Sequence, residues 1–482
     1  MKTVWVLLPF LLLQAALGLY RLDLLPTWGD ENHTLEKVLP PWDGSLCDRD
    51  VHPPLYFLLA RGWVRLGWPD PLLSLRALSV LFLLISTVVI DRIWLARLRQ
   101  FSRVLFLSLW TLSPCLLLYG RMARSYTLQV LLFLLVVAAA RRLLDRPDSP
   151  RIGLVYCLSA AALLYLHYIP GLAAVGAVGG VLLWRRRIQV ALLSGLLVLL
   201  LYAPWLICLS QAASIVARKE VYRLVPSLLL DQGVRLAYWF VSFFYGETPP
   251  VWAIAGGLLL APALLFLLVD AFRSRAEWRL LIAPAALLGY LGIGQWASFA
   301  FVPARLLWLL PFAWLAIADL EQGHRRLRTA VAAALLCLSA GSIHSYFGKQ
   351  DFLNKGYLIP YQEIASLFEK SADPNGAIVL LDLDQIDTGP FAARAWPAGI
   401  RLVRDAAALP ALLAKRPAAT LWHLRRQYPE VPLAAQLGER YALRRYTWVP
   451  YSRLDRAIME ALGWARRPTH VVEALEFRPV LK

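Results

Sequence analysis

The chain has 482 residues, of which 59% are hydrophobic and 17% are charged, and its mean hydropathy is +0.55. Soluble domains carry about 25% charged residues. The composition therefore excludes an ordinary soluble protein and indicates a polytopic membrane protein. The formal net charge is +18. Because many arginines stand in short clusters between apolar runs, as in the cytoplasmic loops of membrane proteins, no nucleic-acid partner is needed to explain that charge.

Apolar runs long enough, or nearly long enough, to cross a bilayer recur along the first 350 residues. We expect membrane-spanning helices near residues 4–20, 74–95, 104–119, 126–140, 152–168, 171–184, 188–208, 251–270, 280–300, 304–320 and 329–347. The first run follows Lys2 and ends in the stretch QAALG, so it fits either a cleaved signal peptide or a signal anchor. We favour the anchor, because further spans follow it.

The connections between these runs alternate in their arginine content. Arginine-rich connections occur at residues 97–103, 141–151, 185–187, 273–279 and 321–328. If the N-terminus is cytoplasmic, all five fall inside, as the positive-inside rule requires. This pattern predicts about 11 spans and a C-terminus on the outer face. The outer face then receives a first loop at 21–73, a segment at 209–250 and the tail.

Two segments outside the spans have patterns of their own. Residues 54–68 place Arg61 and Arg65 on one face of an otherwise apolar helix, which is typical of a helix lying in the membrane interface. From residue 348 the sequence predicts a small soluble α/β domain, 348–482, beside a transmembrane domain, 1–347. We expect helices at 361–370 and 410–416, strands at 376–387 and 399–405, and either strand or helix at 419–426 and 440–449.

The segment 376–387 begins with the strand-like apolar run and ends with three acids. They are Asp382, Asp384 and Asp387. Because no glycine-rich loop accompanies them, we interpret them as the solvated end of a strand. The fold class is therefore an α-helical polytopic membrane protein with a small extracytoplasmic α/β C-terminal domain.

The first outer loop is unusually polar for so apolar a chain. Asp30 and Glu31 stand at the head of a helical pattern, where acids favour the first turn. Capping explains one acid, but it does not explain the other polar residues of the same loop, which are His33, Asp43, Asp48, Asp50 and His52. Acids and histidines beside a membrane suggest a carboxylate base, a cation and a partner that approaches from the bilayer. Pro53 and Pro54 fix the backbone after His52.

Five short motifs in chain order give a specific resemblance. They are Asp30-Glu31 in WGDENHT, Asp50-x-His52-Pro-Pro-Leu-Tyr, Tyr119, Arg124 and Tyr126 in YGRMARSY, His167-Tyr168, and RLLWLLP from Arg305 to Pro311. Together they resemble bacterial GT-C glycosyltransferases of the family-39 and RgtA–D-like type, relatives of the protein O-mannosyltransferases and of the aminoarabinose transferase ArnT. The resemblance covers about residues 1–320. Met122 and Leu306 depart from it, where the family often has Glu and Tyr.

The resemblance implies transfer of a sugar from a polyprenyl-phosphate donor, with inversion, to an envelope acceptor at the outer face of the bacterial inner membrane. Asp30 would be the catalytic base and Glu31 a supporting acid. The donor phosphate would be bound by Arg124 and Arg305, with His52, His167 and Arg121 as further candidates, because guanidinium groups match phosphate oxygens. Asp50, Tyr126 and Tyr168 would support the acceptor or the site. The acceptor is a glycolipid such as lipopolysaccharide, a glycan or a protein.

Neither a cofactor nor a metal site is firmly indicated. A divalent cation is possible, because some relatives use one and because Asp30, Glu31, Asp43, Asp48 and Asp50 offer oxygen ligands. No fixed spacing demands such an ion. The five cysteines are scattered without a C-x-x-C pattern, so we expect neither a metal site nor a disulfide framework.

Other interpretations stay open. The main alternative is a membrane transporter or a lipid-linked sugar flippase, but such proteins place ionisable residues within spans, whereas the notable charges here stand at the outer ends of the spans. A non-catalytic scaffold would have no use for the acid pair. Within the segment 209–250, the basic residues Arg218, Lys219, Arg223 and Arg235 fit either a cover over the donor groove or a segment that meets anionic lipid.

Overall fold

The computed structural model describes residues 2–40, 52–216, 228–275, 278–296, 302–370, 376–382, 391, 396–426, 437, 441–448 and 472–480. The chain divides into two compact units. The helical unit comprises Met1–Leu22 and Val38–Phe352, and the sheet unit comprises Asp23–Lys37 and Leu353–Lys482. Part of the first outer loop, including Asp30 and Glu31, thus groups with the C-terminal residues.

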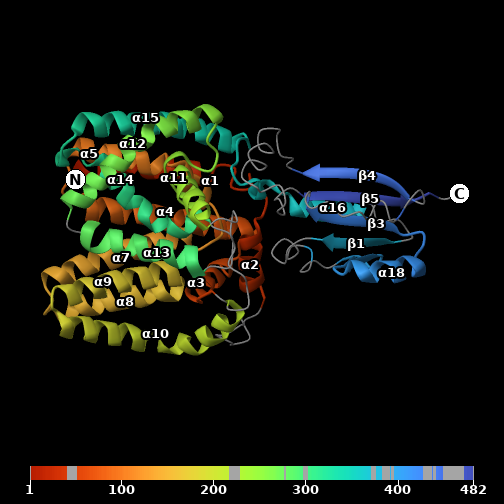
Figure 1. The fold of residues 1–482 in the computed structure, drawn as a ribbon, viewed down its shortest axis with the longest axis horizontal. Coiled ribbons are helices and arrows are strands. Elements are labelled where there is room, and N and C mark those ends of the chain that lie inside the picture. The colour runs from red at the N-terminus through yellow and green to blue at the C-terminus, as the bar shows by residue number, and fades with distance from the viewer. Residues whose placement is uncertain are drawn as a thin grey trace. The chain divides into compact units, whose positions relative to one another are not determined.

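The helical unit is a bundle whose first half follows the expected apolar runs (Figure 1). Its elements are α1 (Lys2–Leu19), α3 (Leu55–Val64), α4 (Pro71–Val89) with a π-helical continuation (Ile90–Trp94), α5 (Gln100–Thr111), α6 (Pro114–Tyr119), α7 (Tyr126–Asp145), α8 (Pro150–Leu166) and α9 (Tyr168–Trp184). The expected span at 104–119 is divided between α5 and α6. Pro114 cannot continue the hydrogen bonding of α5, and the Ser113 hydroxyl accepts from the Leu116 N–H to begin α6.

The second half of the bundle adds one helix that the sequence did not predict. Its elements are α10 (Ile188–Val216), α11 (Leu228–Tyr245), α12 (Val251–Ser274), a π-helical turn (Trp278–Ile282), α13 (Ala283–Trp296), the 3-10 segment η3 (Pro303–Leu309), α14 (Leu310–Ala318) and α15 (Arg325–Phe347). The unexpected helix is α11, within the segment 209–250, and it packs against α6, α12 and α15. Among the described residues, five helices are long and apolar enough to cross a membrane, namely those ending at Trp94, Asp145, Leu209, Ser274 and Phe347.

Arginines of the expected cytoplasmic connections bind acids of neighbouring elements. Arg103 holds the buried Asp91 through two bonds, Nε to Oδ1 at 2.5 Å and Nη2 to Oδ2 at 2.7 Å. Arg275 pairs with Asp319, and Arg328 pairs with Asp270. A bidentate guanidinium–carboxylate pair fixes geometry as well as charge. These arginines therefore join the helix ends on the face that the sequence assigns to the cytoplasm.

In the described part of the sheet unit, a five-stranded sheet has helices packed on both of its faces. The strands are β1 (Ala377–Asp382), β2 (Ile400–Val403), β3 (Thr420–Arg426), β4 (Tyr441–Trp448) and β5 (Val472–Pro479), in the order β2-β1-β3-β5-β4. β1 is parallel to β2 and β3, whereas β5 is antiparallel to β3 and β4. The segments 419–426 and 440–449, for which the sequence allows either strand or helix, therefore form strands.

Alternation along β1 explains why both faces of the sheet are covered. Val379 and Leu381 pack with α16 (Tyr361–Lys370), and Ile378 and Leu380 pack with α18 (Leu409–Lys415). The expected helices at 361–370 and 410–416 are confirmed. The α/β character predicted for the C-terminal residues is confirmed for the part of them that the structure describes.

One sequence-based expectation about the cysteines is wrong. Cys115, Cys157 and Cys337 are free, but Cys208, which lies within α10 eight residues before its end at Val216, is disulfide-bonded. Spacing along the chain does not reveal which cysteines approach within bonding distance in a fold. Disulfides persist in oxidising compartments, so this bond agrees with the extracytoplasmic position expected for the part of α10 around Cys208.

Candidate active site

Four of the residues singled out in the sequence gather in the helical unit, and we call them the His–Arg cluster: His52, Arg124, His167 and Arg305. His52 precedes α3, Arg124 lies in the turn between α6 and α7, His167 separates α8 from α9, and Arg305 lies in η3. Each stands at the end of a helix or between two helices. Four separate connections of the bundle therefore meet at one place.

One close contact joins two members of the cluster, and electrostatic interactions link the others. Nη2 of Arg124 lies 3.4 Å from Nε2 of His52. His167 is within electrostatic range of His52, Arg305 and Arg124. Arg124 is buried, and its carbonyl oxygen accepts a hydrogen bond of 3.3 Å from the Ser79 hydroxyl of α4. The guanidinium is thus presented from a fixed backbone.

The hydrogen bonding of His167 defines its tautomer. The backbone N–H of Ile169 donates to Nδ1 of His167 at 3.2 Å, as an N-cap of α9. A nitrogen that accepts a hydrogen bond carries no proton, so the neutral ring holds its proton on Nε2. His167 therefore offers an N–H donor toward an anion rather than a second acceptor.

Arg305 stands on a rigid segment. Its carbonyl oxygen accepts a bond of 2.8 Å from the Trp308 indole N–H, and the Trp308 ring packs against Phe133 of α7 at 4.3 Å between centroids. Leu306, which replaces the Tyr frequent in the resembling family, is fully buried. Met122, which replaces the frequent Glu, is also buried. Both departures therefore add apolar side chains to the packed interior.

Arg121 is not in the His–Arg cluster, although it stands only three residues before Arg124. Its Nη2 donates to the carbonyl oxygens of Tyr20 and Arg21 at 2.8 and 2.5 Å. Its guanidinium also lies over the rings of Tyr346 and Phe347, 5.3 and 5.5 Å from their centroids. The two arginines of the YGRMARSY turn therefore have different surroundings: Arg124 belongs to the His–Arg cluster, whereas Arg121 joins the ends of α1 and α15.

The two tyrosines predicted to support the site are positioned differently. Tyr126 is buried at the start of α7 and meets Tyr119 edge to face, with 5.9 Å between ring centroids. Tyr168 begins α9, and its hydroxyl accepts a bond of 3.0 Å from the Trp205 indole N–H. Tyr126 therefore belongs with Tyr119 at the end of α6, whereas Tyr168 joins α9 to α10.

Sequence reasoning missed one carboxylate, that of Glu247 between α11 and α12. It is 1% exposed and accepts hydrogen bonds from three hydroxyls, those of Tyr119 at 2.6 Å, Tyr238 at 2.8 Å and Ser242 at 2.8 Å. Burial raises its pKa above the ordinary 4.5, and the three hydroxyl donors oppose that rise. The only sequence signal was an acid beside a glycine and two prolines in YGETPP.

Gly246 explains how Glu247 reaches this position. It has φ +86°, a conformation that residues with a side chain rarely adopt. A Cβ placed on it would also lie 2.4 Å from Cβ of Pro114. Both the backbone and the available space therefore require glycine here, and the chain turns closely over the start of α6.

The acid pair Asp30-Glu31 lies in the sheet unit, in the first turn of α2 (Gly29–Val38). Oε2 of the buried Glu31 accepts from the backbone N–H of Trp28 at 3.1 Å. This bond from the third helical residue back to the preceding N-cap is one half of a capping box. Asp30 is half-buried. The two neighbouring acids therefore have different environments, which the sequence did not separate.

The segment before α2 is held by residues from the C-terminal part of the sheet unit. The Trp28 ring meets the buried Tyr357 ring edge to face at 5.3 Å between centroids. The Gln362 side-chain amide of α16 donates to the Thr27 hydroxyl at 3.4 Å. Residues following the transmembrane domain thus support the helix that carries Asp30.

Several predicted residues cannot be placed. Asp43, Asp48, Asp50, Arg218, Lys219, Arg223, Asp384 and Asp387 lie outside the described residues. Arg235 is described, and its Nε pairs with Asp231 at 2.7 Å one turn away on α11, with both side chains buried. Within the described part of the chain, no group of three or more His, Cys, Asp or Glu residues is arranged to hold a metal ion.

The predicted strand end at Asp382 has a specific partner. Its carboxylate lies 3.4 Å from Nε2 of the buried His423 on β3. This hydrogen bond holds the pKa of Asp382 below its ordinary value, and the charges of His423 and Arg425 act in the same direction. Asp382 is thus half-exposed but tied to the neighbouring strand.

The His–Arg cluster has the chemistry of an anion site. Two guanidinium groups supply planar arrays of donors suited to phosphate oxygens, and the Nε2–H of His167 adds a neutral donor. Partial burial strengthens such interactions because it lowers the local dielectric. The arrangement can hold a phosphate group at the ends of α3, α7, α9 and η3.

No protein-family model matches the chain, and no curated protein matches its sequence. Solved structures do match its fold. The structure of ArnT from Cupriavidus metallidurans bound to undecaprenyl phosphate aligns over 99% of this chain and 98% of that chain, with TM-score 0.54 and 13% identity. The apo structure of the same protein aligns over 98% of each chain, with TM-score 0.56 and 13% identity. The fold of this chain is therefore that of ArnT, as its resemblance to GT-C glycosyltransferases predicted.

Proposed function

We propose that this protein is a membrane glycosyltransferase that transfers a sugar from a polyprenyl-phosphate donor to an envelope acceptor at the outer face of the bacterial inner membrane. The observation that carries the proposal is the His–Arg cluster, because it gathers phosphate-binding groups within a fold like that of ArnT, one structure of which is bound to undecaprenyl phosphate. The acceptor is a glycolipid or lipopolysaccharide, a glycan or a protein.

In the proposed reaction, Asp30 takes the proton from the acceptor nucleophile as it attacks the anomeric carbon, with inversion. Arg124 and Arg305 balance the negative charge that grows on the leaving phosphate, and His167 donates from Nε2 to an oxygen of the same group. Because a phosphate leaves as a stable anion, no strong general acid is needed. Donors placed in advance around developing charge commonly lower the activation barrier more than any other single effect.

The capping bond of Glu31 supports a division of labour within the acid pair. One oxygen of Glu31 accepts from the Trp28 N–H, so Glu31 holds the first turn of α2 rather than competing for the acceptor proton. The C-terminal domain, which we place outside the membrane, supports that turn from the sheet unit through Tyr357 and Gln362.

The test is transfer by the purified protein in proteoliposomes, with radiolabelled polyprenyl-phosphate sugar and an extract of envelope lipids and glycans. We expect a labelled acceptor with wild type and none with Arg124→Gln folded to the same extent. Movement of the labelled lipid between leaflets without any transfer would instead identify a flippase. Transfer that is unchanged in Arg124→Gln would contradict the assignment of the His–Arg cluster.

A further inference from the structure

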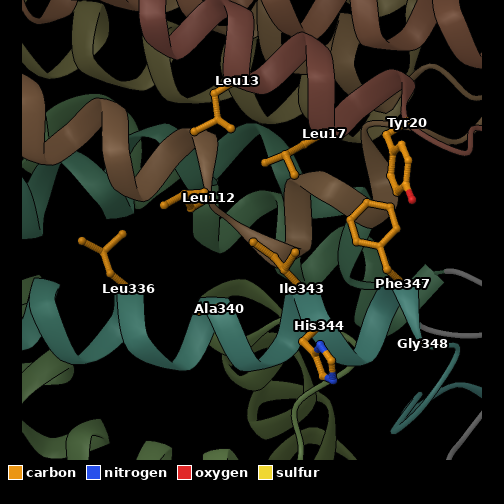
Figure 2. Close-up of a pocket in the computed structure, with 10 residues that line it drawn as sticks. All are labelled: Leu13, Leu17, Tyr20, Leu112, Leu336, Ala340, Ile343, His344, Phe347 and Gly348. Atoms are coloured by element: carbon orange, nitrogen blue, oxygen red, sulfur yellow. The ribbon is translucent and has the colours of Figure 1, made fainter.

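A second place on the helical unit, away from the His–Arg cluster, has the form of a lipid site. A cavity of about 610 Å³ lies between α1, the residue after α5 and α15. Its volume falls within the range of about 300–1,000 Å³ found for small-molecule sites. Figure 2 shows Leu13 and Leu17 of α1 facing Leu336 and Ile343 of α15 across it. We call this cavity the α1–α15 groove.

The length of the groove matches one leaflet of a bilayer. Its lining residues on α15 run from Leu336 to Phe347, which is about 16 Å of helix at a rise of ~1.5 Å per residue. One leaflet supplies about half of the ~30 Å hydrocarbon core. Leu13 is 42% exposed and Ala340 is also exposed. The groove is therefore open at the surface of the bundle, where a chain can enter from the side.

The polar groups of the groove are confined to one end. Tyr20 and His344 line it there, where α1 and α15 both terminate, and the remaining lining is apolar. The Tyr20 ring meets the Phe347 ring edge to face at 5.4 Å between centroids. Arg121 holds this end by its bonds to the Tyr20 and Arg21 carbonyl oxygens and by its position over Phe347. The end of the groove is thus constructed from α1, α15 and the turn that carries Arg121.

The same end is basic. Arg21 and Lys349, the second residues after α1 and α15, are exposed and both have positive φ, 47° and 55°. A non-glycine residue in this conformation costs about 1 kcal/mol or more. With Arg121 and His344 they supply the basic groups near this end. Of the two acids that follow at equal distance in the sequence, Asp351 accepts from the Ser345 hydroxyl at 2.7 Å, and Asp23 belongs to the sheet unit. Basic residues also offset the partial negative charge of helix C-termini, but that accounts for neither the groove nor its length.

We propose that the α1–α15 groove binds one hydrocarbon chain of an anionic phospholipid of the outer leaflet, with the lipid phosphate beside Arg21, Lys349 and His344. The charge and the apolar length select this occupant together, because a free anion would not fill the groove and a lipid without net charge would leave the positive charge of the basic end uncompensated. Arg121 connects the groove to the turn that carries Arg124, so a bound lipid would steady that turn. The proposal does not depend on the transfer reaction.

The test uses the full-length protein in a neutral detergent, with phosphatidylglycerol that carries a photoreactive group in one acyl chain. We expect crosslinks on the peptides of α1 and α15 that contain Leu13, Leu17 and Ile343. Phosphatidylcholine with the same chain should crosslink there less, and inorganic phosphate in excess should not compete. Equal crosslinking by the two lipids, crosslinks spread evenly over exposed helices such as α10, or full competition by inorganic phosphate would each overturn the proposal.

Variants separate the chain site from the head-group site. Ala340→Trp should block the groove and abolish the crosslinks, whereas Ala333→Trp, at an exposed position of the same helix outside the groove, should retain them. Arg21→Gln with Lys349→Gln should weaken crosslinking by phosphatidylglycerol about fivefold for each residue and weaken crosslinking by phosphatidylcholine less, because choline compensates the charge of its phosphate. Crosslinks that persist in Ala340→Trp would contradict the proposal. The wild-type comparison of the two lipids decides the matter even if a variant fails to fold.

Discussion

The Tyr119 hydroxyl donates a hydrogen bond of 2.6 Å to Oε1 of Glu247, a residue 128 positions later in the chain. Tyr119 ends α6 and immediately precedes the turn that carries Arg121 and Arg124. Glu247 also accepts from two hydroxyls of α11. The buried carboxylate of Glu247 therefore connects α11 to the start of the turn between α6 and α7. That turn carries Arg124 of the His–Arg cluster.

Removing the Glu247 carboxylate should destabilise the helical unit. Glu247→Ala removes the acceptor of three hydroxyls, two of which belong to the buried Tyr119 and Ser242, and the loss of a buried hydrogen bond costs about 1–3 kcal/mol when the polar group stays unsatisfied. We expect a clear fall in Tm of the purified protein, measured by thermal unfolding in detergent, and a smaller fall for Glu247→Gln, which keeps one acceptor oxygen. Equal Tm values for Glu247→Ala and wild type would contradict this role.

The same residue predicts a dependence of stability on pH. Burial raises the pKa of Glu247 above 4.5 in the folded protein, so the folded state binds this proton more tightly than the unfolded state. The resulting stabilisation is complete below pH 4.5 and is lost as the pH rises through the folded-state pKa. We therefore expect the Tm of wild type to fall relative to that of Glu247→Gln as the pH is raised from 4.5. A difference that stays constant with pH would contradict the raised pKa.

The two neighbouring acids of α2 should respond differently to neutralisation. Asp30→Asn removes the proposed base and should reduce kcat at least about 100-fold, with unchanged Tm. Glu31→Gln can still accept from the Trp28 N–H, so we expect less than about tenfold loss of kcat and a modest fall in Tm, since caps contribute about 0.5–2 kcal/mol. Initial rates of sugar transfer and thermal unfolding measure the two effects. The reverse pattern would exchange the two roles.

Substitution of the two arginines of the YGRMARSY turn should also have different effects on activity and stability. Arg124→Lys replaces a planar guanidinium by a single ammonium in the His–Arg cluster and should lower kcat/KM on the order of 100-fold, the loss expected when one transition-state donor is removed. Arg121→Lys disturbs the junction of α1 and α15 and should mainly lower the Tm. Kinetics with varied donor concentration distinguish these outcomes. An equal loss of kcat/KM in both variants would place Arg121 in the donor site after all.

The C-terminal domain should influence catalysis through the segment before α2. Tyr357→Leu removes an aromatic edge contact with Trp28, a contact type that contributes about 0.5–1.5 kcal/mol beyond burial. We expect kcat to fall about tenfold through misplacement of Asp30, with the KM for the donor unchanged. Tyr441→Leu is the matched control, since Tyr441 packs on the α18 side of the same sheet. The interpretation fails if both variants lose activity in proportion to their loss of Tm.

The sequence by itself determined the membrane class, most of the helices and the candidate residues. Apolar runs, clustered arginines and β-strand alternation are local patterns, so they predicted α4, α7, α12 and the α/β character of the C-terminal residues. The amphipathic helix α11 was not predicted, because basic and aromatic residues are mixed in its segment and this composition is typical of a connection between spans. The motifs also singled out His52, Arg124, His167 and Arg305, which the fold places together.

Only the tertiary structure decided which contacts each of two neighbouring residues makes. Arg121 and Arg124 are three residues apart in a turn. The Arg121 guanidinium contacts the ends of α1 and α15, whereas the Arg124 guanidinium lies beside His52. Glu31 and Asp30 differ because one of them reaches back to an N-cap. Glu247 gains its importance from Tyr119, which is 128 residues away. Local patterns determine which elements form, whereas contacts between distant elements determine which side chains share one environment, and no spacing in the sequence encodes those contacts directly.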